Sequence, residues 1–202
     1  MSSGSMMGLV GSSLLIAAAG RLLLQHVNLS LQWRASAVAL LLLAGWIPAG
    51  GLPAVAYLRG VIGDLSVSTL LLLTASLVSY GIGRRLIQAR EQAVWFAVVI
   101  AAALFLYPMA LGLGGFDPYA LGYGSYALAT ALLLLTLAAW FARCHYAVLS
   151  VLAAVAASLA GLLDSTNLWD YLIDPLLAGY ALFWWLRRAA RVASAPAPST
   201  VS

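Results

Sequence analysis

The stretch that decides the fold is Ala127-Leu-Ala-Thr-Ala-Leu-Leu-Leu-Leu-Thr-Leu-Ala-Ala-Trp-Phe-Ala142, which contains no charged residue. A second run of the same kind extends from Ala37 to Trp46. Apolar residues are continuous in both runs, whereas strands of a membrane barrel alternate apolar and polar residues over about ten positions. Because only helices and closed barrels satisfy their own backbone groups in lipid, these runs predict membrane-spanning helices.

The rest of the chain has the same composition. Of its 202 residues, 64% are hydrophobic and 8% are charged, and the mean hydropathy is +1.00. About a quarter of the residues of a soluble domain are charged. The few polar residues here are not enough to cover the apolar surface of a soluble fold of this size. We therefore expect an all-α, polytopic transmembrane helical bundle that is in contact with the lipid bilayer.

Membrane spans need about 20 mostly apolar residues. Six strong spans are predicted, and an earlier, weaker segment at 6–24 contains Arg21. We expect that segment to form a seventh, N-terminal span, with an interfacial helix as the alternative. Together the spans predict one transmembrane domain over 1–192 and a small, polar, disordered tail at 193–202. The six strong spans are expected at 35–57, 64–83, 92–114, 119–142, 146–163 and 170–186.

The charged residues sort by the side of the membrane on which each connection is expected. All ten basic residues are arginine, and nine of them fall on one side of the predicted topology, with Arg59 alone on the other. The acidic residues fall on the side of Arg59, except Glu91. Arginine-rich connections face the cytoplasm. Because the composition is typical of bacteria, we expect a multi-pass inner-membrane protein with a cytoplasmic C-terminus.

Five residues on the outer side are candidate ligand-binding residues. Arg59 needs an anionic partner near the membrane, which is either an aspartate or a group of a ligand. Asp64 and Asp117 stand where helices are expected to begin, so N-capping is the alternative role for each. Asp170 and Asp174 are one helical turn apart. Two like charges on one face favour a compensating group, and interfacial water is the alternative partner.

No catalytic motif accompanies these residues. The chain contains no Gly-x-Ser-x-Gly elbow, no His-Glu-x-x-His zinc helix and no phosphate-binding Gly-rich loop with its lysine. The single cysteine, Cys144, excludes an intrachain disulfide and a cysteine-based metal cluster. The sequence therefore predicts no catalytic residue, no metal and no cofactor. Because the arginines are spread over short connections, membrane orientation explains them better than nucleic-acid binding does.

Two functions fit this sequence. The first is a non-catalytic accessory or assembly partner of a larger envelope enzyme or transporter, which contacts that partner or its own copies through packing surfaces. The second is a small transporter or lipid-processing membrane enzyme with an outer-face polar pocket. The pocket hypothesis predicts that Arg59 and at least two of the candidate aspartates converge around an open cavity. The accessory hypothesis predicts dispersed helix caps and an exposed apolar or small-residue face, such as the one that Gly4, Gly8 and Ser12 would form.

Overall fold

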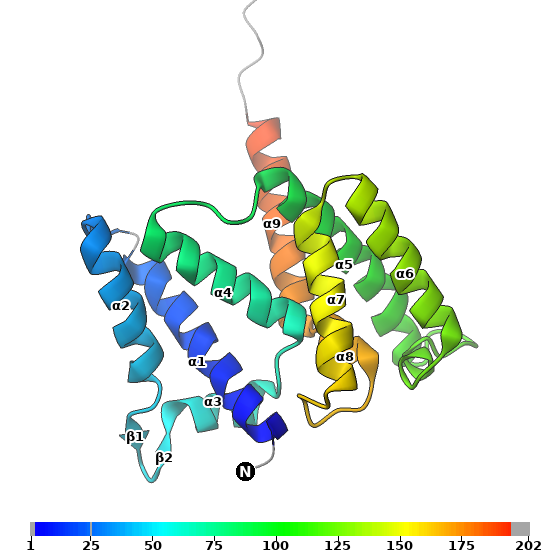
Figure 1. Ribbon diagram of the computed structural model, residues 1–202, viewed down its shortest axis with the longest axis horizontal. Helices are drawn as coiled ribbons and strands as arrows, with labels where there is room; N and C mark the ends of the chain where they lie inside the picture. The colour runs from blue at the N-terminus through cyan, green and yellow to red at the C-terminus, as the bar shows by residue number, and fades with distance from the viewer. Residues whose placement is uncertain (1–2, 25, 195–202) are drawn as a thin grey trace, which may run out of the picture.

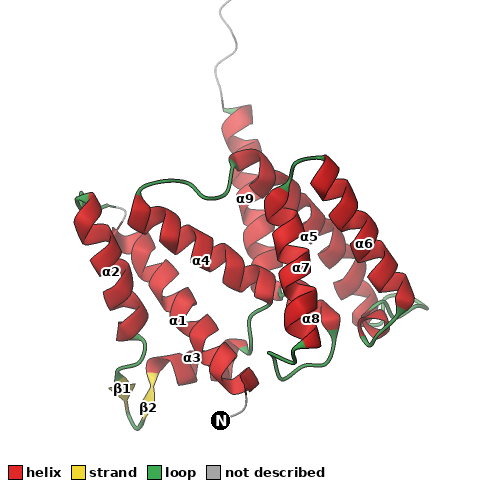
Figure 2. Cartoon of the chain, viewed as in Figure 1, coloured by secondary structure: helices red, strands yellow, loops and turns green. Residues whose placement is uncertain are grey.

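The computed structural model describes residues 3–24 and 26–194, and within these ranges the protein is mostly α-helical, as expected (Figure 1, Figure 2). A 3₁₀ turn, η1 (Tyr119–Gly122), precedes α6, and a hairpin of β1 (Pro48–Ala49) and β2 (Leu52–Pro53) lies between α2 and α3. Most of the expected tail, residues 195–202, lies outside the described residues. The helices are α1 (Ser3–Leu24), α2 (Leu31–Ala44), α3 (Ala54–Ile62), α4 (Val67–Ile82), α5 (Ala89–Ala110), α6 (Tyr126–Phe141), α7 (His145–Leu159), α8 (Leu168–Leu172) and α9 (Pro175–Ala193).

Two of the described helices are long and apolar enough to cross a membrane, namely α1 over Gly4–Leu24 and α5. The apolar helices α2, α4, α6 and α7 have 14, 16, 16 and 15 residues. At 1.5 Å per residue they are about 21–24 Å long, which is less than the roughly 30 Å of hydrocarbon in a bilayer. Helix length thus supports two spans, and six or seven spans stay a prediction.

The segment predicted as one span at 35–57 is interrupted by a β-hairpin. Pro48 and Pro53 are paired across its two antiparallel strands. At the turn, Gly50 and Gly51 have φ angles of +70° and +101°, a region that glycine adopts without steric cost. A helix cannot continue through this segment, because proline also lacks the backbone N–H that a helix requires. The local turn residues therefore outweigh the apolar composition on which the prediction depended.

The start of the span predicted at 119–142 is also irregular. The chain first forms η1, and α6 begins only after Ser125, whose hydroxyl accepts a hydrogen bond from the Ala127 N–H at 3.1 Å. Between the two elements Gly124 has a φ angle of +90°. The regular helix is therefore shorter than the predicted span, and η1 forms a separate turn before it.

The last predicted span, 170–186, is divided into two helices. Helix α8 ends before Ile173, which is extended with φ −141° and ψ 149°. Helix α9 then begins at Pro175, and the Asp174 carboxylate accepts a hydrogen bond from the Leu177 N–H at 2.8 Å. Aspartate is favoured at the N-cap and proline in the first turn. The helix therefore starts anew here, so that Asp170 and Asp174 do not share one helix face, and it continues to the beginning of the expected tail.

The long helices run between two ends of the molecule (Figure 1), and the charged residues at these ends differ. We call one the arginine end, at the top of Figure 1. It consists of residues 26–30, the α4–α5 and α6–α7 connections, the helix turns next to them and the C-terminal part of α9. The acidic end consists of the hairpin, α3, η1, α8 and the connections around them, at the bottom. Helix α4 runs obliquely and packs against α1 and α2 on one side and against α7 on the other.

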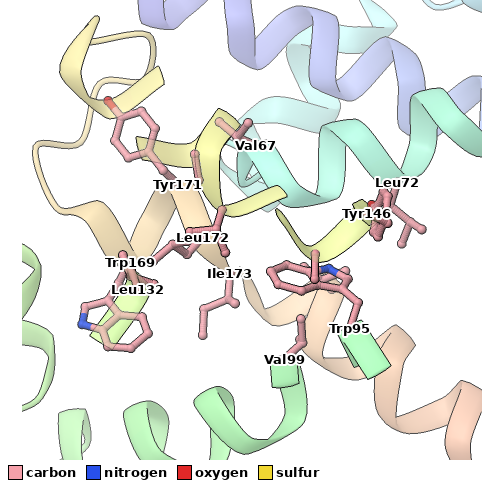
Figure 3. Packing of buried hydrophobic residues seen from close by; sticks show 14 of the residues in the cluster. Val67, Leu72, Trp95, Val99, Leu132, Tyr146, Trp169, Tyr171, Leu172 and Ile173 are labelled. Atoms are coloured by element: carbon pink, nitrogen blue, oxygen red, sulfur yellow. The ribbon is translucent and has the colours of Figure 1, made fainter. Parts of the chain in front are cut away.

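The core lies where α4, α5, α6, α7, α8 and α9 meet (Figure 3). Trp95 of α5 packs edge-to-face against Tyr146 of α7, with ring centroids 6.3 Å apart. Phe96 packs in the same way against Tyr180 of α9 at 5.6 Å. Tyr171 of the short α8 is buried in this core. The aromatic contacts therefore join α5 to α7 and to α9, the helix that Asp174 precedes.

Candidate functional site

A cavity of about 420 Å³ opens at the acidic end, a volume that falls within the range of small-molecule sites. Its polar lining comes from different parts of the chain: Asp64 precedes α4, Tyr107 belongs to α5, Tyr119 to η1, Asp170 to α8, and Asp174 precedes α9. The rest of the lining is mostly apolar. It consists of Leu106, Ala110, Leu163, Ser165, Ile173 and Pro175.

Arg59 does not line this cavity but holds one of its carboxylates. Its Nε donates a hydrogen bond to Asp64 Oδ1 at 2.7 Å, and its Nη2 donates to Asp64 Oδ2 at 3.2 Å. The same Nη2 donates to Asp164 Oδ2 at 2.9 Å. The hydrogen bond with Asp64 is the main cause that raises the pKa of Arg59, against an opposing effect of burial. Asp64 is therefore an ion-pair partner, while Ser66 is the N-cap of α4.

Asp174 is buried, and both of its carboxylate oxygens are hydrogen-bonded. Oδ2 accepts from the Ser66 N–H at 2.9 Å and from the Thr69 hydroxyl at 2.5 Å. Oδ1 accepts from the Leu177 N–H at 2.8 Å. The carboxylate therefore lies between the N-terminal ends of α4 and α9, where the helix dipoles stabilise a negative charge.

Asp170 and Asp117 both contact Tyr119, but only Asp170 lines the cavity. The Tyr119 hydroxyl donates to Asp170 Oδ2 at 2.9 Å, and the Ser165 hydroxyl donates to the same oxygen at 2.5 Å. Burial, followed by this hydrogen bond, raises the pKa of Tyr119, so the hydroxyl stays a neutral donor. Asp117 is exposed and accepts from the Tyr119 backbone N–H at 2.9 Å. It therefore stabilises the turn that leads into η1, whose N-cap residue is Pro118.

Tyr107 is a cavity residue that sequence reasoning missed. Its hydroxyl is buried and has no hydrogen-bond partner among the described residues. Because buried polar atoms are almost always paired, this hydroxyl favours a water molecule or a ligand atom in the cavity. The sequence signal was weak: a tyrosine next to Pro108 near the outer end of a predicted span is also typical of the interfacial aromatic belt. Asp164, the second partner of Arg59, was likewise missing from the predicted set.

The structure thus brings together part of the predicted site. Asp64, Asp170 and Asp174 line one cavity, and Arg59 contacts the first of them. Asp117 lies outside the cavity. Three of the predicted aspartates therefore share a cavity, as the pocket hypothesis requires. Arg59 contacts only one of these three, because its other partner is Asp164, which was not in the predicted set.

The small-residue face of α1 packs inside the molecule, against the ion pairs. A Cβ atom placed on Gly8 would collide with the side chains of Arg59 and Asp64, and one placed on Gly4 would collide with Asp164. Ser12, one turn further along, is buried as well. The close approach of α1 to α3 therefore explains these glycines without a partner protein.

Comparison of the chain with protein families, with curated proteins and with solved structures finds no match. Among the described residues there is also no group of three or more His, Cys, Asp or Glu side chains placed to hold a metal ion. The function is therefore inferred from the geometry and charge of the acidic end.

Proposed function

We propose that the chain is a multi-pass inner-membrane protein that binds an amphiphilic ligand with a cationic group in the cavity of its acidic end. The observation that carries this proposal is the lining: Asp64, Asp170 and Asp174 meet in one cavity, and none of the residues that line it is basic. Asp164 lies next to the cavity as the second partner of Arg59, so four carboxylates and one guanidinium give this region a formal charge of −3. A cation is the ligand group that complements such a site.

The apolar residues of the cavity lining indicate that the rest of the ligand is hydrophobic. Leu106, Leu163 and Ile173 offer an alkyl chain a surface away from water, and burial of each CH₂ group contributes about 0.8 kcal/mol. The unpartnered Tyr107 hydroxyl adds a hydrogen-bonding group within the same cavity. An alkylamine or an amine-bearing lipid headgroup fits this combination, and a site for either suits a small transporter or a lipid-processing protein.

Six or seven membrane spans, with the acidic end outside and the C-terminus in the cytoplasm, belong to the same proposal. The lengths of α1 and α5 support it, as does the course of α1, α2, α4, α5, α6, α7 and α9 between the two ends (Figure 1). The arginine end carries nine of the ten basic residues, which is the distribution expected for a cytoplasmic face. Local bilayer thinning and flanking irregular segments such as η1 accommodate the shorter helices.

Titration with octylamine and octanol tests the ligand proposal, because the two compounds share an alkyl chain and differ in charge at pH 7. We expect the purified protein in nanodiscs, measured against empty nanodiscs, to bind the amine about tenfold more tightly or better. A hydrogen bond to a charged group contributes about 1.5–3 kcal/mol, and about 1.4 kcal/mol corresponds to a tenfold difference. Equal affinity for the two compounds would exclude a cation site.

A matched pair of substitutions localises that preference. Asp170→Asn removes one carboxylate from the cavity lining and should lower the preference for the amine several-fold. Asp117→Asn removes an acid from the same end but outside the cavity, and should leave the preference unchanged. If both variants behave alike, the preference arises from the general charge of the acidic end and not from the cavity.

The accessory role remains a second candidate, because two helices have largely unburied surfaces. Helix α2 has no buried residue, and in α6 only Leu128, Leu132 and Ala139 are buried. Lipid covers such faces, but another membrane helix can also pack against them. Purification in mild detergent followed by native mass spectrometry distinguishes the two. A stoichiometric protein partner would support the accessory role, whereas a chain without a partner that still prefers octylamine would contradict it.

A further inference from the structure

Two arginines of the arginine end converge on one aromatic ring. The guanidinium carbon of Arg21, in the last turn of α1, lies 5.8 Å from the centre of the Tyr80 ring in α4. That of Arg34, in the first turn of α2, lies 5.5 Å from the same centre. Their hydrogen bonds to described residues go to backbone carbonyls: Arg21 donates to Ser76 at 3.5 Å, and Arg34 donates to Leu29 at 3.1 Å. Both charges therefore lie within 6 Å of the centre of one ring.

No carboxylate of the described residues compensates this pair. The ion pairs found there both involve Arg59 at the opposite end. Glu91, the one acid expected on this side, accepts hydrogen bonds from the backbone N–H groups of Gln88 and Tyr146, each at 3.3 Å. Because both arginines are half-buried, their repulsion is screened less than at a fully exposed site. An anion that contacts both guanidinium groups would remove the repulsion and accept charge-assisted hydrogen bonds.

An apolar groove begins beside these arginines. It has a volume of about 290 Å³, lies between α1, α2 and α4, and includes Ala35 and Gly81, the residues that follow Arg34 and Tyr80 in the sequence. From there it continues along Val38 of α2 and apolar side chains of α1 and α4. The groove therefore joins a basic site at the arginine end to an apolar surface that faces the proposed membrane interior.

We propose that the two arginines and this groove bind an anionic phospholipid of the inner leaflet. The phosphate contacts Arg21 and Arg34, and one acyl chain lies in the groove between α2 and α4. Charge complementarity supports the phosphate, and the continuity of the apolar groove with the arginine pair supports the acyl chain. Basic sites between membrane helices on the cytoplasmic side are suited to such headgroups. The inference rests on the membrane location proposed above but not on the ligand of the acidic cavity.

The test compares phosphatidylglycerol with phosphatidylcholine, which differ in net charge. The purified protein is incubated with each lipid in detergent, and native mass spectrometry measures the bound fraction. We expect about a tenfold preference or more for phosphatidylglycerol, because the choline cation of phosphatidylcholine cancels the phosphate charge that the two guanidinium groups attract. Arg21→Gln/Arg34→Gln should abolish the preference. Arg84→Gln/Arg85→Gln removes the same charge from exposed residues of the same end and should retain it.

A third variant tests the groove without a change in charge. Val38→Trp fills the groove and should weaken phosphatidylglycerol binding about tenfold, while both arginines remain. Circular dichroism verifies the helical content of each variant. An unchanged affinity in Val38→Trp, an equal loss in the two arginine pairs, or equal binding of both phospholipids by the wild type would overturn the proposal. If octylamine is not preferred over octanol while phosphatidylglycerol is still preferred over phosphatidylcholine, only the ligand proposed for the acidic cavity fails.

Discussion

At the scale of single residues, the acidic end is stabilised by carboxylates whose partners come from distant parts of the chain. Asp174 joins the beginnings of α4 and α9, and Arg59 holds both Asp64 and Asp164. Asp170 accepts hydrogen bonds from two hydroxyl groups. Each acid therefore has a structural role as well as its proposed role in the cavity, and substitutions affect stability according to burial and geometry.

The two ion pairs of Arg59 should differ in strength. Asp64 forms the two-bond pair with a side chain that is 20% exposed, whereas the Asp164 side chain is 56% exposed. We expect a double-mutant cycle of Arg59→Gln and Asp64→Asn to give a coupling energy of about 1–2 kcal/mol. The cycle with Asp164→Asn should give less than about 1 kcal/mol, because water screens exposed pairs. Reversible unfolding in mixed micelles measures both, and a stronger coupling to Asp164 would contradict this geometry.

Tyr119 should make the protein sensitive to alkaline pH. Its pKa is raised in the folded state, so the folded protein keeps a proton that the unfolded chain loses near pH 10. The stabilisation is fully present below about pH 10 and is lost as the pH rises towards the folded-state pKa. Tyr119→Phe should therefore reduce the loss of thermal stability between about pH 9 and 11. Tyr126→Phe, at a side chain that is 90% exposed, should not, and equal effects would contradict the assignment.

At the scale of elements, α4 and α5 could be predicted closely, because long apolar runs have clear ends. The span expected at 64–83 corresponds to α4, which is capped by Ser66 and by Gly83 at a φ angle of +68°. The hairpin within 35–57 was missed, and 170–186 was predicted as a single span, because proline and glycine end a helix even where hydropathy stays high. The aspartates were expected at one end of the molecule because they fall in alternate connections between the predicted spans. The sequence could not show which of these aspartates share a cavity, because this depends on contacts between distant parts of the chain. Asp174 and its partner Ser66, for example, are 108 residues apart.

The junction of α4 and α9 depends on Asp174. Asp174→Ala removes the cap of α9 and leaves the Ser66 N–H and the Thr69 hydroxyl without this acceptor. We expect the free energy of unfolding to fall by about 2–4 kcal/mol, since a lost cap costs about 1 kcal/mol and the unsatisfied Ser66 N–H about 1–3 kcal/mol. The Thr69 hydroxyl keeps the Ser66 hydroxyl as a partner at 3.0 Å. Asp174→Asn keeps an acceptor oxygen and should cost less. If the two variants are equally stable in thermal unfolding, the cap does not hold this junction.

The packing of α1 on α3 should not tolerate a methyl group at Gly8. A Cβ atom there has no room beside Arg59 and Asp64, and overpacking costs about 1–3 kcal/mol. Gly179→Ala in α9 is the matched control, because nothing lies within 4 Å of a Cβ atom at that position. Alanine is the better helix former by about 1 kcal/mol, so this variant should be slightly stabilised. Thermal unfolding should therefore show shifts of opposite sign, and a stabilised Gly8→Ala would contradict the close packing.

At the scale of the whole molecule, helix α4 connects the two proposed sites. At its N-terminal end, the N-cap Ser66 and Thr69 donate hydrogen bonds to the Asp174 carboxylate of the acidic cavity. Near its C-terminal end, the Tyr80 ring contacts the guanidinium groups of the two arginines. The helix also packs against both halves of the bundle. The two sites are therefore at opposite ends of one element, which fits a protein whose ends face different sides of a membrane.

Labelling of single cysteines in intact bacterial cells tests this orientation most directly. In a Cys144→Ala background, Thr166→Cys places a thiol at an exposed position of the acidic end, and Leu86→Cys places one at an exposed position of the arginine end. We expect a membrane-impermeant maleimide to label the first in intact cells and the second only after permeabilisation, with the protein retained in carbonate-washed membranes. The reverse pattern, labelling of both in intact cells, or release of the protein by carbonate would contradict a multi-pass protein whose acidic cavity faces outward.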